Sequence, residues 1–279
     1  MQVDIATLHP FAGHPYQVRD DAEMDALVES IQAQGILTPL VVRPIDGNKK
    51  EYEVISGHRR LHACKKAGIT TVPALVYAID RDAAAIALVD SNLHREHILP
   101  SEKAFAYKLK MEALSKQGKR TDLTSRQVGE KLSVTQLSES SNESERQIHR
   151  YIRLTNLIPG ILEKVDEGRI ALTPAVELSY LTETEQANLS ETIESEDCTP
   201  SLSQAIALKQ SSQSGDLTMD RIFTIMTQPK ANQQEKISFK VSEIRDYFPK
   251  NYTAAQMSKD ILKGLELLKR QRQRNRDAR

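Results

Sequence analysis

The sequence predicts an α+β N-terminal domain, followed by an all-α domain with a helix-turn-helix and by a small, mainly helical C-terminal domain. Three observations support this prediction. Short β-branched runs alternate with helical patterns over residues 1–100, strand signals are absent after Gly118, and aromatic residues make up only 5% of the 279 residues, with no Trp. So few aromatic residues suit modest helical cores rather than one large sandwich or barrel. We place the domains at residues 1–100, 101–189 and 217–279, with a linker at 190–216.

The α+β domain is predicted from hydrophobic periodicity and from turn residues. Its expected elements, in chain order, are a helix over 21–34, strands over 40–42 and 51–55, a helix over 59–67, a strand over 72–77, and helices over 81–93 and 101–116. Gly35 and Gly68 stand where left-handed helix caps are wanted, and Asp46-Gly47-Asn48 separates the first two strands as in a hairpin. Pro100 breaks the chain between the last two helices.

Beyond Gly118 the pattern is one of short helices broken by turns, such as Pro159-Gly160 and Glu167-Gly168. Residues 190–216 are rich in Ser, Gln and acidic residues and hold one short apolar patch at 202–208. This composition indicates a linker or a weakly ordered helix.

The C-terminal domain ends in a helix with an apolar stripe. Thr253 and Gln256 have the spacing of a capping box at its start. The stripe consists of Met257, Ile261, Leu265 and Leu268. A stripe of this kind pairs two copies of a chain or packs on its own domain, and the pattern favours neither.

Residues 134–154 meet the demands of a helix-turn-helix. The motif needs a small residue where its helices cross, a turn residue that tolerates positive φ, and an apolar residue that packs the second helix. Ser138, Asn142 and Ile148 occupy these positions in register. Ser144 and Gln147 form a capping-box spacing for the second helix. A helix over 125–132 is expected to precede and support the motif.

The second helix of this motif has one apolar and one basic side. Ile148, Tyr151 and Ile152 are expected to face the core. The residues expected to contact DNA are Ser144, Arg146, Gln147, His149, Arg150 and Arg153. Arg and Gln read guanine and adenine edges bidentately in the major groove. The competing interpretation is a solvated basic face without a ligand.

The charge is balanced overall, with 38 basic and 38 acidic residues, so any DNA contact must be local. Residues 269–279 hold six Lys or Arg and one Asp, a net charge of six minus one, or +5. Residues 183–197 are acidic. We expect the basic run to contact phosphates without sequence preference.

Cysteine usage and hydropathy indicate a cytoplasmic protein without a membrane partner. Cys64 and Cys198 lie far apart and lack metal-ligand spacing, which is typical of free thiols in a reducing compartment. No basic region followed by an apolar run opens the chain, and no stretch approaches the ~18 apolar residues of a membrane span.

Two polar segments indicate phosphate binding. Residues 55–60 run from a strand into a helix start, where free N–H groups and the helix dipole favour an anion, and Arg59 and Arg60 add fork-shaped donors. Residues 92–96 place an amide, a guanidinium and a carboxylate at a helix end, suited to a metal or a phosphate. Each segment alone also fits an ordinary polar surface.

Taken in order, these segments resemble the ParB family of chromosome and plasmid partition proteins over residues 1–180. The motifs are PYQVR at 15–19, GILTP at 35–39 followed by VVR at 41–43, GHRR at 57–60, NLHR at 92–95, and then the helix-turn-helix. The resemblance implies a ParB/sulfiredoxin-like N-terminal domain that binds CTP, a central domain that recognises a palindromic centromere-like site, and a C-terminal dimerisation domain.

The resemblance also implies a mechanism and a set of site residues. DNA loads a dimeric clamp, and CTP closes it so that it slides along double-stranded DNA on a nucleoid or plasmid, with a ParA-type ATPase as an expected partner. The implied nucleotide residues are Arg19, Gly57, His58, Arg59, Arg60, Asn92 and Arg95. Asn92 would also hold Mg²⁺, and Gln17 would sit at the hydrolysis-linked position of what is at most a slow CTPase, converting CTP to CDP and phosphate.

The chain departs from the family pattern at three positions. The family usually has Glu at His58, Gln at Thr38 and Glu at Ser91. The carboxylate absent at Ser91 is a hard oxygen ligand of the kind that Mg²⁺ prefers, and Asp90 or Glu96 could replace it.

These departures favour an alternative function, a ParB-like transcriptional regulator of a plasmid or mobile element that holds DNA without cycling nucleotide. Enzymes of the same fold fit less well. Sulfiredoxin-like enzymes have their nucleophilic Cys where Gly57 stands, and a free serine kinase built on this fold would not require the helix-turn-helix.

Overall fold

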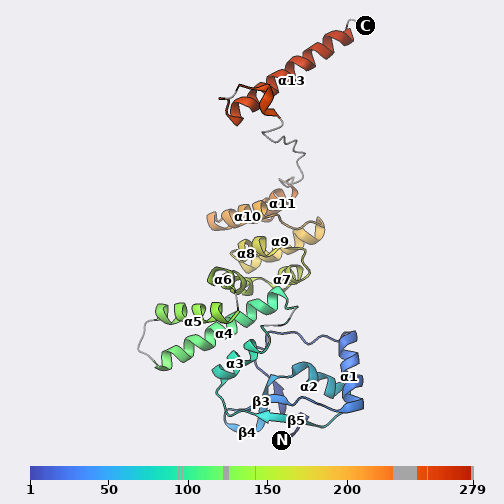
Figure 1. Ribbon diagram of the computed structural model, residues 1–279, viewed down its shortest axis with the longest axis vertical. Coiled ribbons are helices and arrows are strands. Elements are labelled where there is room, and N and C mark those ends of the chain that lie inside the picture. Colours follow the sequence, from blue (N-terminus) through green and yellow to red (C-terminus); the bar gives the residue numbers. More distant parts are fainter. Residues whose placement is uncertain are drawn as a thin grey trace. The chain divides into compact units, whose positions relative to one another are not determined.

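The computed structural model describes residues 1–93, 95, 97–121, 126–141, 143–228, 244–249 and 251–277. The chain divides into two compact units, Met1–Gln228 and Pro229–Arg279. The first unit contains a mixed sheet with its helices and a stack of further helices (Figure 1). None of the described helices is long and apolar enough to cross a membrane.

The N-terminal part of the first unit is built on a five-stranded sheet with the order β1-β5-β3-β4-β2. The strands are β1 (Gln2–Asp4), β2 (Leu8–Pro10), β3 (Leu40–Ile45), β4 (Asn48–Ser56) and β5 (Thr71–Val76). β3 pairs antiparallel with β4, which confirms the predicted hairpin, and parallel with β5. The edge strands β1 and β2 were not predicted; they pair with β5 and β4.

Alternate residues of the central strands face opposite sides of this sheet. Leu40 and Val42 join a core with the helices α1 (Ala22–Gln34) and α2 (His58–Lys66). Val41 packs instead against a second core that includes residues of α3 (Arg81–Asp90) and α4 (Pro100–Thr121). The period of two residues along a strand therefore covers both faces with helices.

The helical part of the first unit begins with α4, which packs against both helices of the predicted helix-turn-helix. Its elements are α5 (Arg126–Ser141), α6 (Glu145–Arg153), η2 (Leu154–Asn156), α7 (Pro159–Asp166), α8 (Leu172–Leu178), α9 (Glu183–Ser195), α10 (Leu202–Ser214) and α11 (Met219–Thr227). One apolar core runs from η2 through α11.

Residues 190–216 are not a linker, which corrects the prediction. They form the end of α9 and all of α10, and Ala205 and Leu208 are fully buried in the common core. The polar composition suggested an exposed segment, but Gln204 is buried. Its side-chain amide donates to the carbonyls of Ile225 at 3.0 Å and Met226 at 3.1 Å. The boundary predicted at residue 217 also moves, since α11 belongs to the first unit.

Two further predictions in the helical part were wrong. The expected separate helix over 125–132 is the beginning of α5, so that the support and the first motif helix are one element. Pro159-Gly160 is not a turn, because Pro159 is the first residue of α7, a position where a missing N–H costs nothing. The turn at Glu167-Gly168 is confirmed, with φ 74° at Gly168.

The second unit contains η3 (Arg245–Tyr247) and the long helix α13 (Ala254–Asp277). The predicted capping box is confirmed, since Thr253 N–H donates to Gln256 Oε1 at 2.9 Å and Gln256 N–H donates to Thr253 Oγ1 at 3.4 Å. Met257 is buried within the unit. Of the other predicted stripe residues, Ile261 is partly buried and Leu265 and Leu268 are exposed, by 56% and 49%; Leu262, outside the predicted stripe, is 63% exposed.

Candidate functional site

The turn from β4 into α2 is shaped for an anion. Gly57 is the N-cap of α2 and has φ 106°, in the left-handed region. A Cβ added there would meet Leu40 Cγ at 3.1 Å and Arg60 Nη2 at 3.2 Å, so glycine is required on both counts. No side chain caps the helix. The first N–H groups of α2 are therefore available to a ligand.

A pocket of about 180 Å³ opens in front of this turn. Its described lining is His14, Tyr16, Gln17, Val18, Ser56, Gly57, His58, Arg59, Arg60, Ser91, Asn92 and Arg95. It therefore brings together all the nucleotide-site residues named from the sequence except Arg19. Arg19 lines an adjoining cleft of about 850 Å³, which shares His14 and Gln17 with the pocket and reaches Pro159 of α7.

Two buried polar atoms of the pocket lining have no hydrogen-bond partner in the described structure, the Tyr16 hydroxyl and His58 Nε2. Tyr16 is 4% exposed, and burial raises the pKa of its hydroxyl, so it is a neutral donor. His58 stacks on His14 with ring centroids 3.7 Å apart. Burial, with His14 beside it, lowers the pKa of His58 to about 3. Buried polar groups normally have partners, so the Tyr16 hydroxyl is a donor and His58 Nε2 an acceptor that a polar ligand of the pocket could satisfy.

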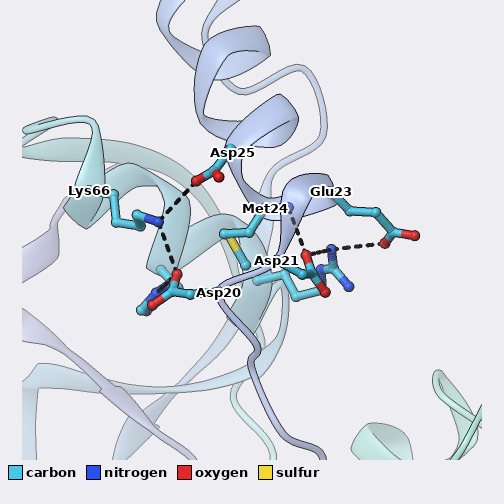
Figure 2. A network of polar contacts seen from close by, with 8 residues as sticks. Asp20, Asp21, Glu23, Met24, Asp25 and Lys66 are labelled. Carbon is cyan, nitrogen blue, oxygen red and sulfur yellow. Dashed lines mark hydrogen bonds and ion pairs between the residues drawn. The ribbon is translucent and has the colours of Figure 1, made fainter.

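The three arginines of the pocket differ in their partners. Figure 2 shows the acidic network beside α1, where Arg59 Nη2 lies 3.1 Å from Glu23 Oε2 and 3.6 Å from Asp21 Oδ1. Arg60 instead donates to the carbonyl oxygens of Thr38 and, at 3.0 Å, Pro39.

Arg95 is exposed, and its guanidinium lies 5.9 Å from the Tyr16 ring centroid. No described carboxylate forms an ion pair with Arg60 or with Arg95. These two guanidinium charges are therefore uncompensated within the described part of the chain.

The predicted Mg²⁺ site is poor in suitable ligands. Asn92 Nδ2 donates to Leu88 O at 2.8 Å. Asp90 forms an ion pair with Lys110 and does not line the pocket, and Glu96 lies outside the described residues. No Asp or Glu is among the described lining residues, and the described chain contains no group of three or more potential metal ligands. The donor set fits an anion and does not fit Mg²⁺.

A buried lysine connects this end of the pocket with the helix-turn-helix. Lys110 of α4 is 3% exposed; its ammonium pairs with Asp90 at the end of α3 and donates to Ser140 Oγ of α5 at 2.8 Å. Glu102 makes a second tie, because its Oε1 accepts the Gln17 N–H at 2.8 Å. α4 is therefore bonded to both the pocket and the helical part.

Two described helices, α5 and α6, occupy the segment predicted as a helix-turn-helix. Ile148 of α6 is fully buried against Leu137 and Tyr107. Ser144 caps α6 by accepting the Gln147 N–H at 3.3 Å, and Ser138 Oγ donates to Glu143 O at 2.7 Å.

One detail of the predicted motif is wrong, and another lies outside the described residues. The Gln147 half of the capping box is not formed, because Gln147 Oε1 accepts from Arg150 at 3.1 Å instead. The turn residue Asn142 lies outside the described residues.

The basic side of α6 faces a shallow groove of about 430 Å³. Arg146 and His149 are exposed there. Arg150 donates to Thr173 Oγ1 at 2.6 Å. Arg153 lies over the Tyr180 ring, with Cζ 3.8 Å from the centroid.

Arg153 also donates to Ser179 Oγ at 3.2 Å. The N-terminal side chains of the basic face are thus free to read a ligand, whereas Arg153 is held by the α8–α9 turn.

Sequence reasoning missed the roles of several lining residues. His14 and Tyr16 contribute a ring and a buried hydroxyl to the pocket, and Lys108 and Tyr180 border the groove beside α6. Tyr16 stands inside the PYQVR segment, so its position in that motif was the available signal. Lys108 and Tyr180 reach α6 from α4 and from the α8–α9 turn, and no local pattern marks them.

Comparison with known proteins relates this chain to chromosome-partitioning proteins and others that share their N-terminal domain. Residues 1–93 match the family described as the ParB N-terminal domain. The chain is 30% identical over 259 residues to the probable chromosome-partitioning protein ParB of Vibrio cholerae, covering 91% of this chain and 80% of that protein. It is 33% identical over 174 residues to stage 0 sporulation protein J of Bacillus subtilis, covering 61% of this chain and 54% of the relative, about half of its length.

Solved structures of low identity also align with the chain. The C-terminally truncated chromosome-partitioning protein ParB of Caulobacter crescentus, complexed to the centromeric parS site, aligns with 21% identity and a TM-score of 0.42, covering 76% of this chain and 99% of that one. The same protein complexed with CTP-γ-S aligns with 22% identity and a TM-score of 0.32, covering 70% and 98%.

Proposed function

The chain belongs to the ParB family of chromosome-partitioning proteins, and from this membership we propose that it is a site-specific DNA-binding partition protein. It binds a palindromic, centromere-like DNA site, and CTP switches it between an open and a closed clamp. Its place of action is the nucleoid or a plasmid in the cytoplasm, and a ParA-type ATPase is its expected motor partner.

The observation that carries DNA reading is the exposed N-terminal part of α6. Arg146 and His149 are exposed on a helix whose opposite side is fixed by the buried Ile148. The N-terminal residues of a recognition helix lie closest to base edges in the major groove. Arg150 and Gln147, which bond to each other, complete the polar surface, and Ser144 is placed to contact the phosphate backbone.

The pocket before α2 supports nucleotide binding. The N–H groups that follow Gly57, together with the uncompensated guanidinium of Arg60, suit a triphosphate, and the unpartnered Tyr16 hydroxyl and His58 Nε2 offer further polar atoms. When bound, the nucleotide would supply negative charge that these groups lack. Arg19 lies in the adjoining cleft, where it would assist only from outside the pocket, and the hydrolysis-linked role of Gln17 stays a prediction.

A homodimer fits the second unit. Leu265 and Leu268 are half exposed on α13, together with Leu262, and a second copy of the helix would cover them. Two copies of α6 would then read the two halves of a palindrome, since the symmetry of a site mirrors that of a dimer. Met257 contributes to the unit's own packing rather than to this surface.

A second candidate function is favoured by the pocket's donor set. The described lining contains no carboxylate, with His58 and Ser91 where the family usually has Glu. A transcriptional regulator of a plasmid or mobile element that holds DNA without cycling nucleotide would need none.

The DNA that co-purifies with the protein tests the proposal. We expect sequencing to recover one enriched palindrome with the wild-type chain and no enrichment with Arg146→Ala. Lys65→Ala, on α2 away from the recognition helix, is the matched control that keeps the enrichment. Recovery of DNA without any shared sequence would contradict site-specific binding. CTP-dependent retention on closed circular DNA separates the clamp from the regulator.

A further inference from the structure

We propose that the pocket before α2 binds the triphosphate of its nucleotide directly, without a divalent cation between phosphates and protein. This inference rests on the proposed nucleotide binding and adds that the nucleotide binds without a metal ion. It follows from the charges and donors that line the pocket.

The positive charge in the pocket is fixed in place by the protein. Arg60 is bonded to carbonyl oxygens, which leave its charge uncompensated, and Arg95 has no described carboxylate partner. Only Arg59 is neutralised, by Glu23 and Asp21 in the network of Figure 2. The partial positive charge of the α2 N-terminus adds to the two uncompensated guanidinium charges.

One polar atom without a partner, the Tyr16 hydroxyl, suits a bare phosphate oxygen. Tyr16 lines the pocket, and its unpartnered hydroxyl can donate one hydrogen bond. His58 Nε2 does not add a donor, because burial keeps the ring neutral and the other ring nitrogen, bonded to the Val54 backbone, carries the proton. A hydrogen bond to a charged acceptor is stronger than one to a neutral acceptor, so a bond from the Tyr16 hydroxyl favours a phosphate oxygen that carries no metal.

A divalent cation has little to hold it here. Mg²⁺ in triphosphate sites is normally held by one or two protein carboxylates as well as by the phosphates. No described lining residue is Asp or Glu, and Asp90 is engaged by Lys110. A cation placed beside Arg60 and Arg95 without a carboxylate would be repelled by like charge.

The test is calorimetric titration of CTP into the full chain, once with saturating Mg²⁺ and once with EDTA, each with and without the recovered DNA site. We expect affinities within about threefold of each other in Mg²⁺ and EDTA, a difference well under one factor of ten in Kd. A loss of about tenfold or more in EDTA would overturn the inference while leaving CTP binding intact. Absence of CTP binding in every arm would instead remove the proposed nucleotide function and this inference with it.

Two substitutions at Ser91 sharpen the test. Ser91→Glu introduces a carboxylate beside Asn92 and should make binding depend on Mg²⁺ by about tenfold or more, the usual weight of a residue that supports a metal. Ser91→Gln has the same length without the charge and should behave like the wild type. If Ser91→Glu binds equally in Mg²⁺ and EDTA, the charge of the lining does not decide metal use and the inference fails.

Two further variants check the individual groups. Tyr16→Phe removes only the hydroxyl and should weaken CTP binding by about tenfold in both Mg²⁺ and EDTA, as expected for a hydrogen bond to a charged group. An unchanged affinity would show that this hydroxyl does not meet the ligand. Glu96→Gln should leave both affinities unchanged, and a loss seen only in Mg²⁺ would identify Glu96 as a metal ligand and refute the inference.

Discussion

Asp90→Asn should destabilise the first unit more than Lys110→Met, although both remove the same ion pair. The side chain of Lys110 is 4% exposed and that of Asp90 is 47% exposed. Without Asp90, a buried ammonium is left with the Ser140 hydroxyl as its remaining partner. Without Lys110, the half-exposed carboxylate is solvated by water, and Met fills most of the space of the lysine chain.

The magnitudes follow from these exposures. Removing one partner of a fully buried pair costs about 3–5 kcal/mol, and the half-exposed partner here reduces the expected cost of Asp90→Asn to about 2–3 kcal/mol. Lys110→Met should cost about 1 kcal/mol or less, because it leaves no buried charge. The double variant should resemble Lys110→Met alone. Lys66→Met, in an exposed ion pair with Asp20 and Asp25, should leave the free energy of unfolding close to that of the wild type and is the matched control.

The assay is urea unfolding followed by far-ultraviolet circular dichroism, since the chain has no Trp to report by fluorescence. Equal denaturant slopes are needed for the comparison of free energies of unfolding. If Lys110→Met costs clearly more than Asp90→Asn, the buried ammonium is not the sensitive partner, and the interpretation of this junction between pocket and recognition helix is wrong.

Four other perturbations have expected outcomes. Burial lowers the pKa of His58 from 6.5 to about 3, so between these pH values the unfolded chain binds a proton that the folded chain does not bind. The free energy of unfolding should therefore fall as pH falls from about 6.5 towards 3, by at most ~1.4 kcal/mol per pH unit. His58→Gln should reduce this pH dependence in acid titrations. Gly57→Ala should cost about 1–3 kcal/mol in urea unfolding, more than Gly13→Ala, which has positive φ but open space. Ile148→Ala should cost about 2–5 kcal/mol in urea unfolding and abolish DNA selection, because it unseats α6 from its fully buried contacts. Deleting residues 269–279 should weaken binding to all DNA alike and reduce the salt dependence of the affinity; a loss confined to one sequence would contradict the phosphate assignment.

Much of the fold was predictable because local signals agree with it. Asp21, the first residue of the predicted helix, is its N-cap and accepts the Met24 N–H at 2.9 Å, and Gly35 follows α1 with φ 71°, as its position indicated. The strands β1 and β2 have three residues each, which is too short for an alternating hydrophobic pattern to be recognised in the sequence. They form because they pair with distant strands, β5 and β4. The polar composition of α10 allowed a linker or a weakly ordered helix, and it gave no sign that Gln204 is buried and bonds to the Ile225 carbonyl.

The candidate sites divide in the same way. Gly57, Arg60 and the face of α6 follow from spacing along one element, so the sequence locates them. Tyr16 and His14 become pocket residues only because the loop before α1 folds over the α2 N-terminus, which is a tertiary event. The burial that sets the low pKa of His58 has the same origin and leaves no mark in the sequence.

The most direct test of the account is the affinity for CTP in the presence of the recovered DNA palindrome, of a scrambled duplex and of no DNA. Binding sites that are coupled must influence each other reciprocally, by a factor that is typically about 5–150. The account predicts that the palindrome raises CTP affinity at least about fivefold over the scrambled duplex, and that Arg146→Ala removes this difference. Equal CTP affinity under all three conditions would contradict a clamp in which the DNA reader and the nucleotide pocket act together.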